Sequence, residues 1–247
     1  MTGSHKPPRA ILGMIWHDLL FAHWPMPPEI LAPLIPAPLV LDTFDGQAWL
    51  GVVPFRMSRV RPLNLPLPGE AFAFAEVNVR TYARAPDGTA GVWFLSLDGQ
   101  HRVGALAARA VFGVPYRYAR VTATTTDDGW TRVASRRHGP VAAELEVRYR
   151  ATGPVGFAER GSLEEFLTDR PSLFAVRGGR LWRGDVEHGP WPLSGAEATF
   201  GRTTITESLG LALPDGPPHL MACARIETIA RRPVVVLEQR PGDRRGS

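Results

Sequence analysis

The sequence contains one cysteine, Cys223, and one lysine, Lys6, among its 247 residues. A single cysteine excludes an intramolecular disulfide and a CxxC metal site, and we expect Cys223 to be a buried, inert thiol. The chain also lacks a basic run of five residues, a zinc-finger motif and a P-loop motif, although its net charge is +4. The scattered arginines therefore reflect composition, and nucleic acid is not an expected partner.

No hydrophobic run is long enough to cross a membrane. The most apolar N-terminal stretch, residues 10–24, is short and contains His17, Asp18 and His23. It also lacks the layout of a signal peptide. We therefore expect a cytoplasmic protein with no membrane partner.

Turn-forming residues are abundant. The chain has 25 glycines and 24 prolines, and 44% of its residues are hydrophobic, which suits many short strands joined by turns. We predict a mainly β (α+β) fold in a single domain over residues 10–239, with loose tails at 1–9 and 240–247. Roughly ten strands and two or three short helices fit an antiparallel barrel that is closed or nearly closed.

The expected elements follow from strand-like runs, turn signals and helix caps. Strands are predicted at residues 15–24, 39–44, 48–57, 74–82, 91–98, 116–124, 130–137, 142–151, 172–176, 180–187, 219–229 and 233–239, with hairpins at 39–57, 74–98 and 172–187. Helices are predicted after Pro27, over residues 100–112 and, from a capping box, over residues 162–168, while 203–211 is an ambiguous, helix-compatible segment.

The hairpin at 74–98 carries the main candidate site. Glu76, Asn78 and Arg80 share one face of its first strand, because strand side chains alternate between faces. An acid, an amide and a guanidinium in one row can orient a carboxylate or carbonyl ligand. The alternative is a solvent-facing row on a half-buried strand.

The register of this hairpin decides whether polar residues of the second strand join the row. A two-residue turn at 87–88 pairs Arg80 with Leu95. One extra loop residue, or a bulge, instead places Ser96 and Asp98 beside the row. We prefer the second register because it groups the polar side chains.

Other side chains near the hairpin complete the expected ligand-binding set. Arg109, on the predicted helix over 100–112, can reach back towards the hairpin, although a solvated arginine is the alternative. Trp93 and Tyr116 can line a cavity, although aromatic residues at such spacings also build cores. Asp98 lies near the start of the helix, where it can act as a cap.

Five pieces of the sequence carry a resemblance to a known family. They are residues 22–57 (AHWPMPPEILAPLIPAPLVLDTFDGQAWLGVVPFRM), 75–82 (AEVNVRTY), 91–98 (GVWFLSLD), 112–116 (FGVPY) and 188–193 (HGPWPL). Together, over about residues 15–238, they resemble the uncharacterised YqjF-like family of the acetoacetate decarboxylase-like superfamily. The resemblance implies a cone-shaped antiparallel β-barrel with flanking helices and an internal cavity.

The resemblance does not extend to the decarboxylase lysine. In the decarboxylases this lysine precedes a Gly-Tyr-Pro-like motif and forms a Schiff base with a keto acid. The matching motif here is residues 113–115, and residues 110–112 offer no amine. Arginine stays protonated and cannot substitute. We therefore expect no Schiff-base decarboxylation, whereas the resemblance places Glu76 where the decarboxylases have a cavity glutamate.

The sequence predicts neither a metal site nor a cofactor. His17, His23, His101 and His188 are candidate general bases, but none lies in an HExxH or HxH arrangement. Asp98 and His101 are three residues apart and could share a metal, although capping is the simpler role for Asp98. No glycine-rich nucleotide fingerprint is present.

Three functions fit these residues. The preferred one is a small-molecule pocket that binds an anionic or carbonyl compound through the row at 76–80. Glu76 would carry out lysine-independent acid/base chemistry there, such as enolisation or hydration. The alternatives are a non-catalytic ligand-binding or sensor module on the same fold, and a lysine-independent decarboxylase, for which no residue supplies an electron sink. Exposed barrel faces are compatible with a homo-oligomer.

Overall fold

The computed structural model of the protein describes residues 8–62, 73–100 and 111–236. Its strands are β1 (Ala10–Met26), β2 (Val40–Leu41), β3 (Ala48–Pro62), β4 (Phe74–Arg84), β5 (Ala90–Gly99), β6 (Tyr116–Tyr118), β7 (Arg120–Thr125), β8 (Thr131–Arg137), β9 (Ala143–Gly156), β10 (Ser172–Arg177), β11 (Arg180–His188), β12 (Leu193–Thr203), β13 (His219–Arg231) and β14 (Val234–Val235). Its helices are α1 (Pro28–Leu31) and α3 (Leu163–Thr168), with 3₁₀ turns η1 (Ala32–Leu34) and η2 (Glu207–Leu209).

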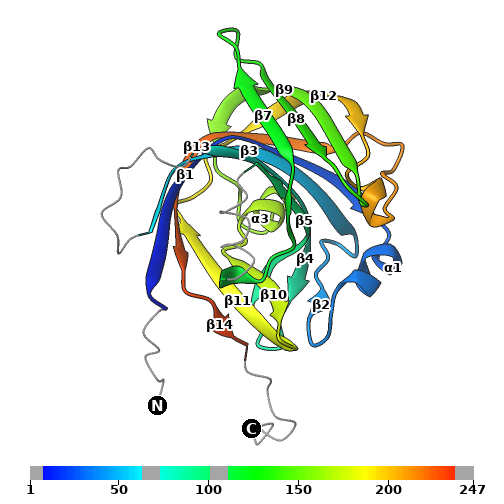
Figure 1. Cartoon of the computed structure of the whole chain (residues 1–247), viewed down its shortest axis with the longest axis vertical. Coiled ribbons are helices and arrows are strands. Elements are labelled where there is room, and N and C mark those ends of the chain that lie inside the picture. Colours follow the sequence, from blue (N-terminus) through cyan, green and yellow to red (C-terminus); the bar gives the residue numbers. More distant parts are fainter. Residues whose placement is uncertain (1–7, 63–72, 101–110, 237–247) are drawn as a thin grey trace, which may run out of the picture.

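Seven of the strands close into a barrel (Figure 1). Their order is β11-β10-β5-β4-β3-β1-β13, and β13 pairs with β11 to complete the ring. Neighbouring strands in the ring are antiparallel except β10 and β5, which are parallel. Closure leaves the ring without an edge and creates an interior. The predicted mainly β barrel with small helices is confirmed.

Helix α3 lies within the ring, as the view in Figure 1 shows. The predicted capping box starts it: the Ser162 hydroxyl accepts a hydrogen bond from the Glu165 amide at 3.2 Å. At its other end the carbonyl oxygen of Leu167 accepts hydrogen bonds from two side chains of β4. These bonds attach α3 to the barrel wall. Helix α1 lies outside the ring.

A second layer covers one outer side of the barrel. Strands β12, β9, β8 and β7 continue the sheet from β13 and fold over β1, β3 and β4 (Figure 1). The layer between barrel and outer sheet is apolar and includes Leu20, Ala22, Leu50, Val52, Val77, Val79, Val121, Val133, Leu145 and Val147. Strand β4 is therefore covered on both faces, with its odd-numbered valines in this layer and Glu76, Asn78 and Arg80 facing the barrel interior.

The preferred register of the β4–β5 hairpin is wrong. Arg80 pairs with Phe94, whereas Val79 pairs with Ser96, so β5 contains a bulge between these pairs. One extra residue exchanges the two faces of a strand. Ser96 and Asp98 therefore lie on the outer face of the barrel wall, on the side opposite to the predicted row.

Three other predicted elements differ from the structure. Residues 45–46 form the predicted turn, but β2 pairs with β4 instead of forming a hairpin with β3. The segment at 203–211 begins at the last residue of β12 and otherwise contains only the short η2. The last strand is limited to Val234–Val235 within the described residues. The predicted helix over 100–112 falls mostly outside the described residues.

Candidate functional site

The interior of the barrel contains a cavity of about 600 Å³. Its walls are largely apolar and aromatic: Met14, Trp16, Leu19, Phe21, Val53, Phe55, Met57, Val92, Phe94, Leu97, Val114, Leu173 and Trp191. Ligand cavities in proteins commonly measure roughly 300–1,000 Å³ and combine such walls with a few polar groups. The polar groups of this cavity are therefore the candidate functional residues.

Glu76, Asn78 and Arg80 all line the cavity. Glu76 and Asn78 are only 5% exposed, so the solvent-facing alternative does not hold. Their partners on β3 are Phe55, Val53 and Gly51, in that order. Buried polar groups normally have hydrogen-bond partners, yet Asn78 Oδ1 has none among the described residues. The amide oxygen is thus available to a ligand or to water.

Tyr116 faces Glu76 at one end of the row. Burial raises the pKa of Glu76 from 4.5 to about 8; the Tyr116 hydroxyl opposes the rise, and the charge of Asp98, behind the strand, adds to it. The hydroxyl makes no well-formed hydrogen bond within the described residues. It lies against Gly99, where an added Cβ would be 2.0 Å from the hydroxyl oxygen. Glycine at this position lets the phenol approach the carboxyl group.

Arg80 lies at the other end of the row, against α3. Its Nη2 donates to the Leu167 carbonyl at 3.1 Å, and its guanidinium lies 5.4 Å from the Phe21 ring centre and 5.8 Å from that of Tyr82. Within residues 8–62, 73–100 and 111–236, no carboxylate forms an ion pair with Arg80, and its Nε is buried without a partner. A cation in this setting favours an anionic ligand.

His23 lies behind Arg80 and is fully buried. Tyr82 donates its one proton to the Leu167 carbonyl at 2.7 Å, so His23 Nε2 must donate to the Tyr82 hydroxyl, also at 2.7 Å. Burial lowers the pKa of His23 well below 6.5, and the Arg80 charge lowers it further. His23 is therefore neutral and supports Arg80 from outside the cavity lining.

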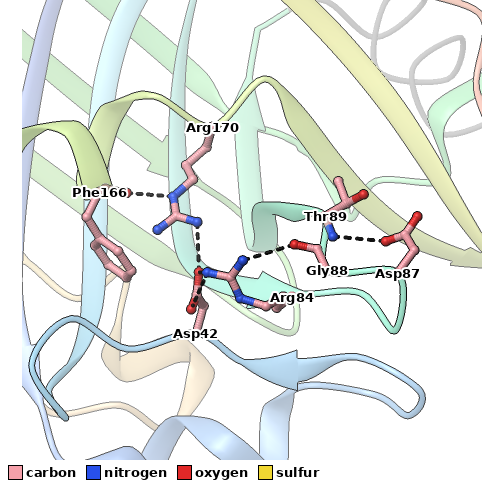
Figure 2. Close-up of polar contacts among 7 residues, drawn as sticks. All are labelled: Asp42, Arg84, Asp87, Gly88, Thr89, Phe166 and Arg170. Atoms are coloured by element: carbon pink, nitrogen blue, oxygen red, sulfur yellow. Dashed lines mark hydrogen bonds and ion pairs between the residues drawn. The ribbon is translucent and has the colours of Figure 1, made fainter. Parts of the chain in front are cut away.

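Arg170, just after α3, also lines the cavity, but its charge is paired (Figure 2). Its Nη1 donates to the Asp42 carboxylate at 2.8 Å and its Nε to the Phe166 carbonyl at 2.7 Å. Arg84 donates to both oxygens of Asp42, at 3.0 and 3.1 Å. This cluster ties the end of α3 to β4 and to the segment after β2. Sequence reasoning missed it, because no local pattern links positions so far apart.

The wall across the ring from β4 carries a histidine. His188, at the end of β11, is the only histidine of the described residues that lines the cavity. Its Nδ1 lies 2.8 Å from the Gly189 carbonyl, which can only accept, so in the neutral ring Nδ1 carries the proton and the lone pair is on Nε2. Its ring packs 4.6 Å from that of Trp191, which stacks on Trp16. The histidine was a candidate base in the sequence, but its place in the cavity lining was not predictable.

Three predicted ligand-binding residues lie outside the cavity lining. Ser96 and Asp98 are fully buried on the outer face, where both bind the guanidinium of Arg137 on β8. Asp98 is therefore not a lining residue of this cavity, and the start of the helix that it was predicted to cap lies outside the described residues. Trp93 also points outwards and packs near Phe174. The bulge in β5 accounts for the first two errors. Arg109 lies outside the described residues.

The described residues contain neither a metal-binding cluster nor a membrane-spanning helix. No three His, Cys, Asp or Glu side chains gather in an arrangement that could hold a metal ion. Of the helices in residues 8–62, 73–100 and 111–236, none has the length and apolarity needed to span a membrane.

Comparison with known proteins places the chain in a family. Residues 13–227 match the model of DUF2071, described as an uncharacterized conserved protein. The uncharacterized protein YqjF of Bacillus subtilis (strain 168) is 39% identical over 210 residues, which cover 85% of this chain and 86% of YqjF.

Solved structures share the fold at low sequence identity. The enduracididine biosynthesis enzyme MppR superposes with a TM-score of 0.65 at 15% identity, covering 95% of this chain and 92% of that one. An acetoacetate decarboxylase-like enzyme from Sphingomonas wittichii RW1 gives 0.63 at 15% identity, covering 96% of both chains. The chain therefore belongs to the DUF2071 family, with YqjF as a relative, and has an acetoacetate decarboxylase-like fold.

Proposed function

We propose that the cavity binds an organic carbonyl or carboxylate compound and that the chain is an enzyme acting on it by proton transfer, without a lysine. One observation carries this proposal: a carboxyl group whose pKa is about 8 faces a phenol inside an apolar cavity. Titratable groups with such perturbed pKa values in a cavity are typical of catalytic sites.

Glu76 and Tyr116 supply two hydrogen-bond donors to one point. At neutral pH Glu76 keeps its proton, so both groups can donate to a carbonyl oxygen. Donors directed at such an oxygen stabilise the negative charge that develops on it during enolisation, and a water-poor site strengthens this effect. The pair is thus suited to hold an enol or enolate.

His188 is the proposed base of the reaction. Its Nε2 lone pair takes a proton from the carbon next to the carbonyl group, and the electrons of that C–H bond form the new C=C bond. The carbonyl oxygen either becomes negatively charged, which gives an enolate, or accepts the Glu76 proton, which gives an enol. Return of the proton to the same or another carbon regenerates His188 and Glu76, so the step needs no external reactant.

Arg80 is the proposed contact of an anionic group on the ligand. Its guanidinium has no carboxylate partner among the described residues, and arginine binds carboxylates with paired, charge-assisted hydrogen bonds. MppR, which shares the fold, is described in complex with pyruvate. A ligand with a carbonyl group and a carboxylate is compatible with both ends of the polar row.

The experiment is a comparison of binding and turnover in Glu76→Gln. A panel of keto acids, enones and lactones is screened by calorimetry for binding and by NMR in D₂O for exchange of the acidic C–H protons. We expect exchange to fall by about 10²-fold or more in the variant, with affinity changed only a few-fold. Glu227→Gln, on the exposed face of β13, is the matched control.

Two results would contradict the proposal. Binding with no exchange or turnover across the panel would make the chain a ligand-binding module. Borohydride trapping of a keto acid on an internal residue would show Schiff-base chemistry, which the sequence argues against because its one lysine is Lys6. Mass spectrometry of compounds that co-purify with the chain extends the panel towards the natural ligand.

A further inference from the structure

We propose that the ligand is an elongated, mostly apolar molecule with a carboxylate at one end and a carbonyl group at the other, bound between Arg80 and the Glu76–Tyr116 pair. This inference rests on the proposed function and names its substrate class. A short oxo acid, in which the two groups are adjacent, cannot reach both ends of the row.

The separation of the two polar centres follows from strand geometry. Glu76 and Arg80 are four residues apart on β4, which places their Cα atoms about 13 Å apart at a rise of about 3.3 Å per residue. The Arg80 guanidinium does not lean back towards Glu76, because it lies near the rings of Phe21 and Tyr82 and donates a hydrogen bond to α3. The Tyr116 hydroxyl is beside Glu76. Two distinct polar groups of one ligand are therefore required.

Apart from Asn78, the wall between these centres is apolar. Val53 and Phe55 of β3 lie on one side of the row and Phe94 and Leu97 of β5 on the other. Asn78 is the polar side chain of β4 between the two centres. An apolar segment of the ligand would cover the four apolar side chains, and burial of apolar area contributes roughly 25 cal/mol per Å². A three-carbon acid would leave most of the 600 Å³ cavity unfilled.

Charge indicates a single carboxylate. Arg170 also reaches the cavity wall, but its guanidinium already contacts the Asp42 carboxylate. Arg80 has no such partner among the described residues. Glu76 is protonated at neutral pH and so does not repel a ligand, yet it offers no positive charge to a second carboxylate. The carbonyl end of the ligand is thus neutral.

The experiment uses the full chain and a series of oxo acids in calorimetry: pyruvate, 4-oxopentanoate, 7-oxooctanoate and 9-oxodecanoate. Decanoate and 2-decanone are the probes that lack one of the two groups. We expect affinity to rise along the series, with a long oxo acid at least about tenfold tighter than pyruvate and than either single-group probe.

Two variants test the carboxylate end and the carbonyl end of the ligand separately. Arg80→Gln should weaken decanoate and 9-oxodecanoate about tenfold and leave 2-decanone unchanged, while Tyr116→Phe should weaken 2-decanone and 9-oxodecanoate and leave decanoate unchanged. Arg80→Lys keeps the charge if Arg80→Gln fails to fold, and Arg132→Gln, exposed on β8, is the control.

The outcomes distinguish this inference from the proposed function. If pyruvate binds most tightly, or if both variants weaken the same single-group probe, the two-ended ligand is wrong even where exchange chemistry is observed. If long oxo acids bind more weakly to both the Arg80 and the Tyr116 variants but their C–H protons do not exchange in D₂O, the ligand class is correct and the enzymatic proposal fails.

Discussion

Asp98 of β5 and Arg137 of β8 form a buried ion pair that joins the barrel to its outer sheet. Arg137 Nη2 lies 2.8 Å from Asp98 Oδ1 and its Nε lies 3.0 Å from Oδ2, with 4% and 0% of the two side chains exposed. Ser96 completes the group by donating to Asp98 and accepting from Arg137. The pair lies behind the wall that carries Glu76, so its expected role is structural.

Removing the charge of Asp98 should destabilise the fold while the shape and the lining of the cavity stay unchanged. In Asp98→Asn the guanidinium remains buried with no counter-charge, and breaking one partner of such a pair costs about 3–5 kcal/mol. Urea denaturation measures this change, and the exposed Asp215→Asn is the control. The double variant Asp98→Leu/Arg137→Met should recover most of the loss. A loss of ligand affinity at full stability would instead show that Asp98 belongs to the binding site.

Glu76 should make the folded state less stable as pH rises. The pKa of Glu76 is 4.5 in the unfolded chain and about 8 in the fold. Below pH 4.5 the carboxyl group is protonated in both states, so its ionisation does not affect the free energy of unfolding. Between pH 4.5 and 8 the unfolded state alone ionises, which lowers the free energy of unfolding by on the order of 5 kcal/mol. Above pH 8 the effect is complete.

Denaturation of Glu76→Gln across this pH range tests the effect. The variant lacks the ionisation but shares all other titrations with the parent chain, including that of His23. From pH 4.5 to 8 the free energy of unfolding of the parent chain should fall relative to that of Glu76→Gln, and above pH 8 the difference should stay constant. Parallel pH profiles for the two proteins would show that Glu76 is ionised in the cavity.

Gly99→Ala should disturb the Tyr116 end of the site. The new Cβ would lie 2.0 Å from the Tyr116 hydroxyl and 2.7 Å from Cζ, so the phenol must move away from Glu76. Overpacking of this kind costs about 1–3 kcal/mol, and binding of carbonyl probes should weaken. Gly216→Ala, which meets open space, is the control. If Gly99→Ala lowers the free energy of unfolding by the same amount in a Tyr116→Ala background, the loss does not come from a clash with Tyr116.

Asp42→Asn should loosen the end of α3. The change leaves Arg170, whose side chain is 7% exposed, without its counter-charge, and we expect a loss of about 3 kcal/mol. Hydrogen exchange of the Asp169 and Arg170 amides, which bond to α3 carbonyls, should become faster. Asp87→Asn in the neighbouring turn (Figure 2) is the control, because asparagine retains the turn geometry. Unchanged exchange rates would show that the Asp42–Arg170 ion pair does not hold the end of α3.

Local patterns predicted the elements of the fold correctly where the cause was local. The capping box at Ser162 starts α3, and the turn at Asp45 and Gly46 has both residues at positive φ, as a tight hairpin-type turn requires. The alternation along β4 placed Glu76, Asn78 and Arg80 on one face. The family resemblance predicted that this face lies inside a barrel, which alternation alone left open.

The sequence by itself determined which residues of β4 share a face, which segments turn, and that no lysine lies beyond position 6. Only the tertiary structure decided that the bulge at Leu95 turns Ser96 and Asp98 away from the cavity. It also decided that Arg137 and Arg170 bind carboxylates distant in the chain, and that His188 lines the cavity. The physical reason is that a bulge and a ring closure are selected by the packing of both faces of a strand at once. Side-chain alternation within one strand carries no information about its partners.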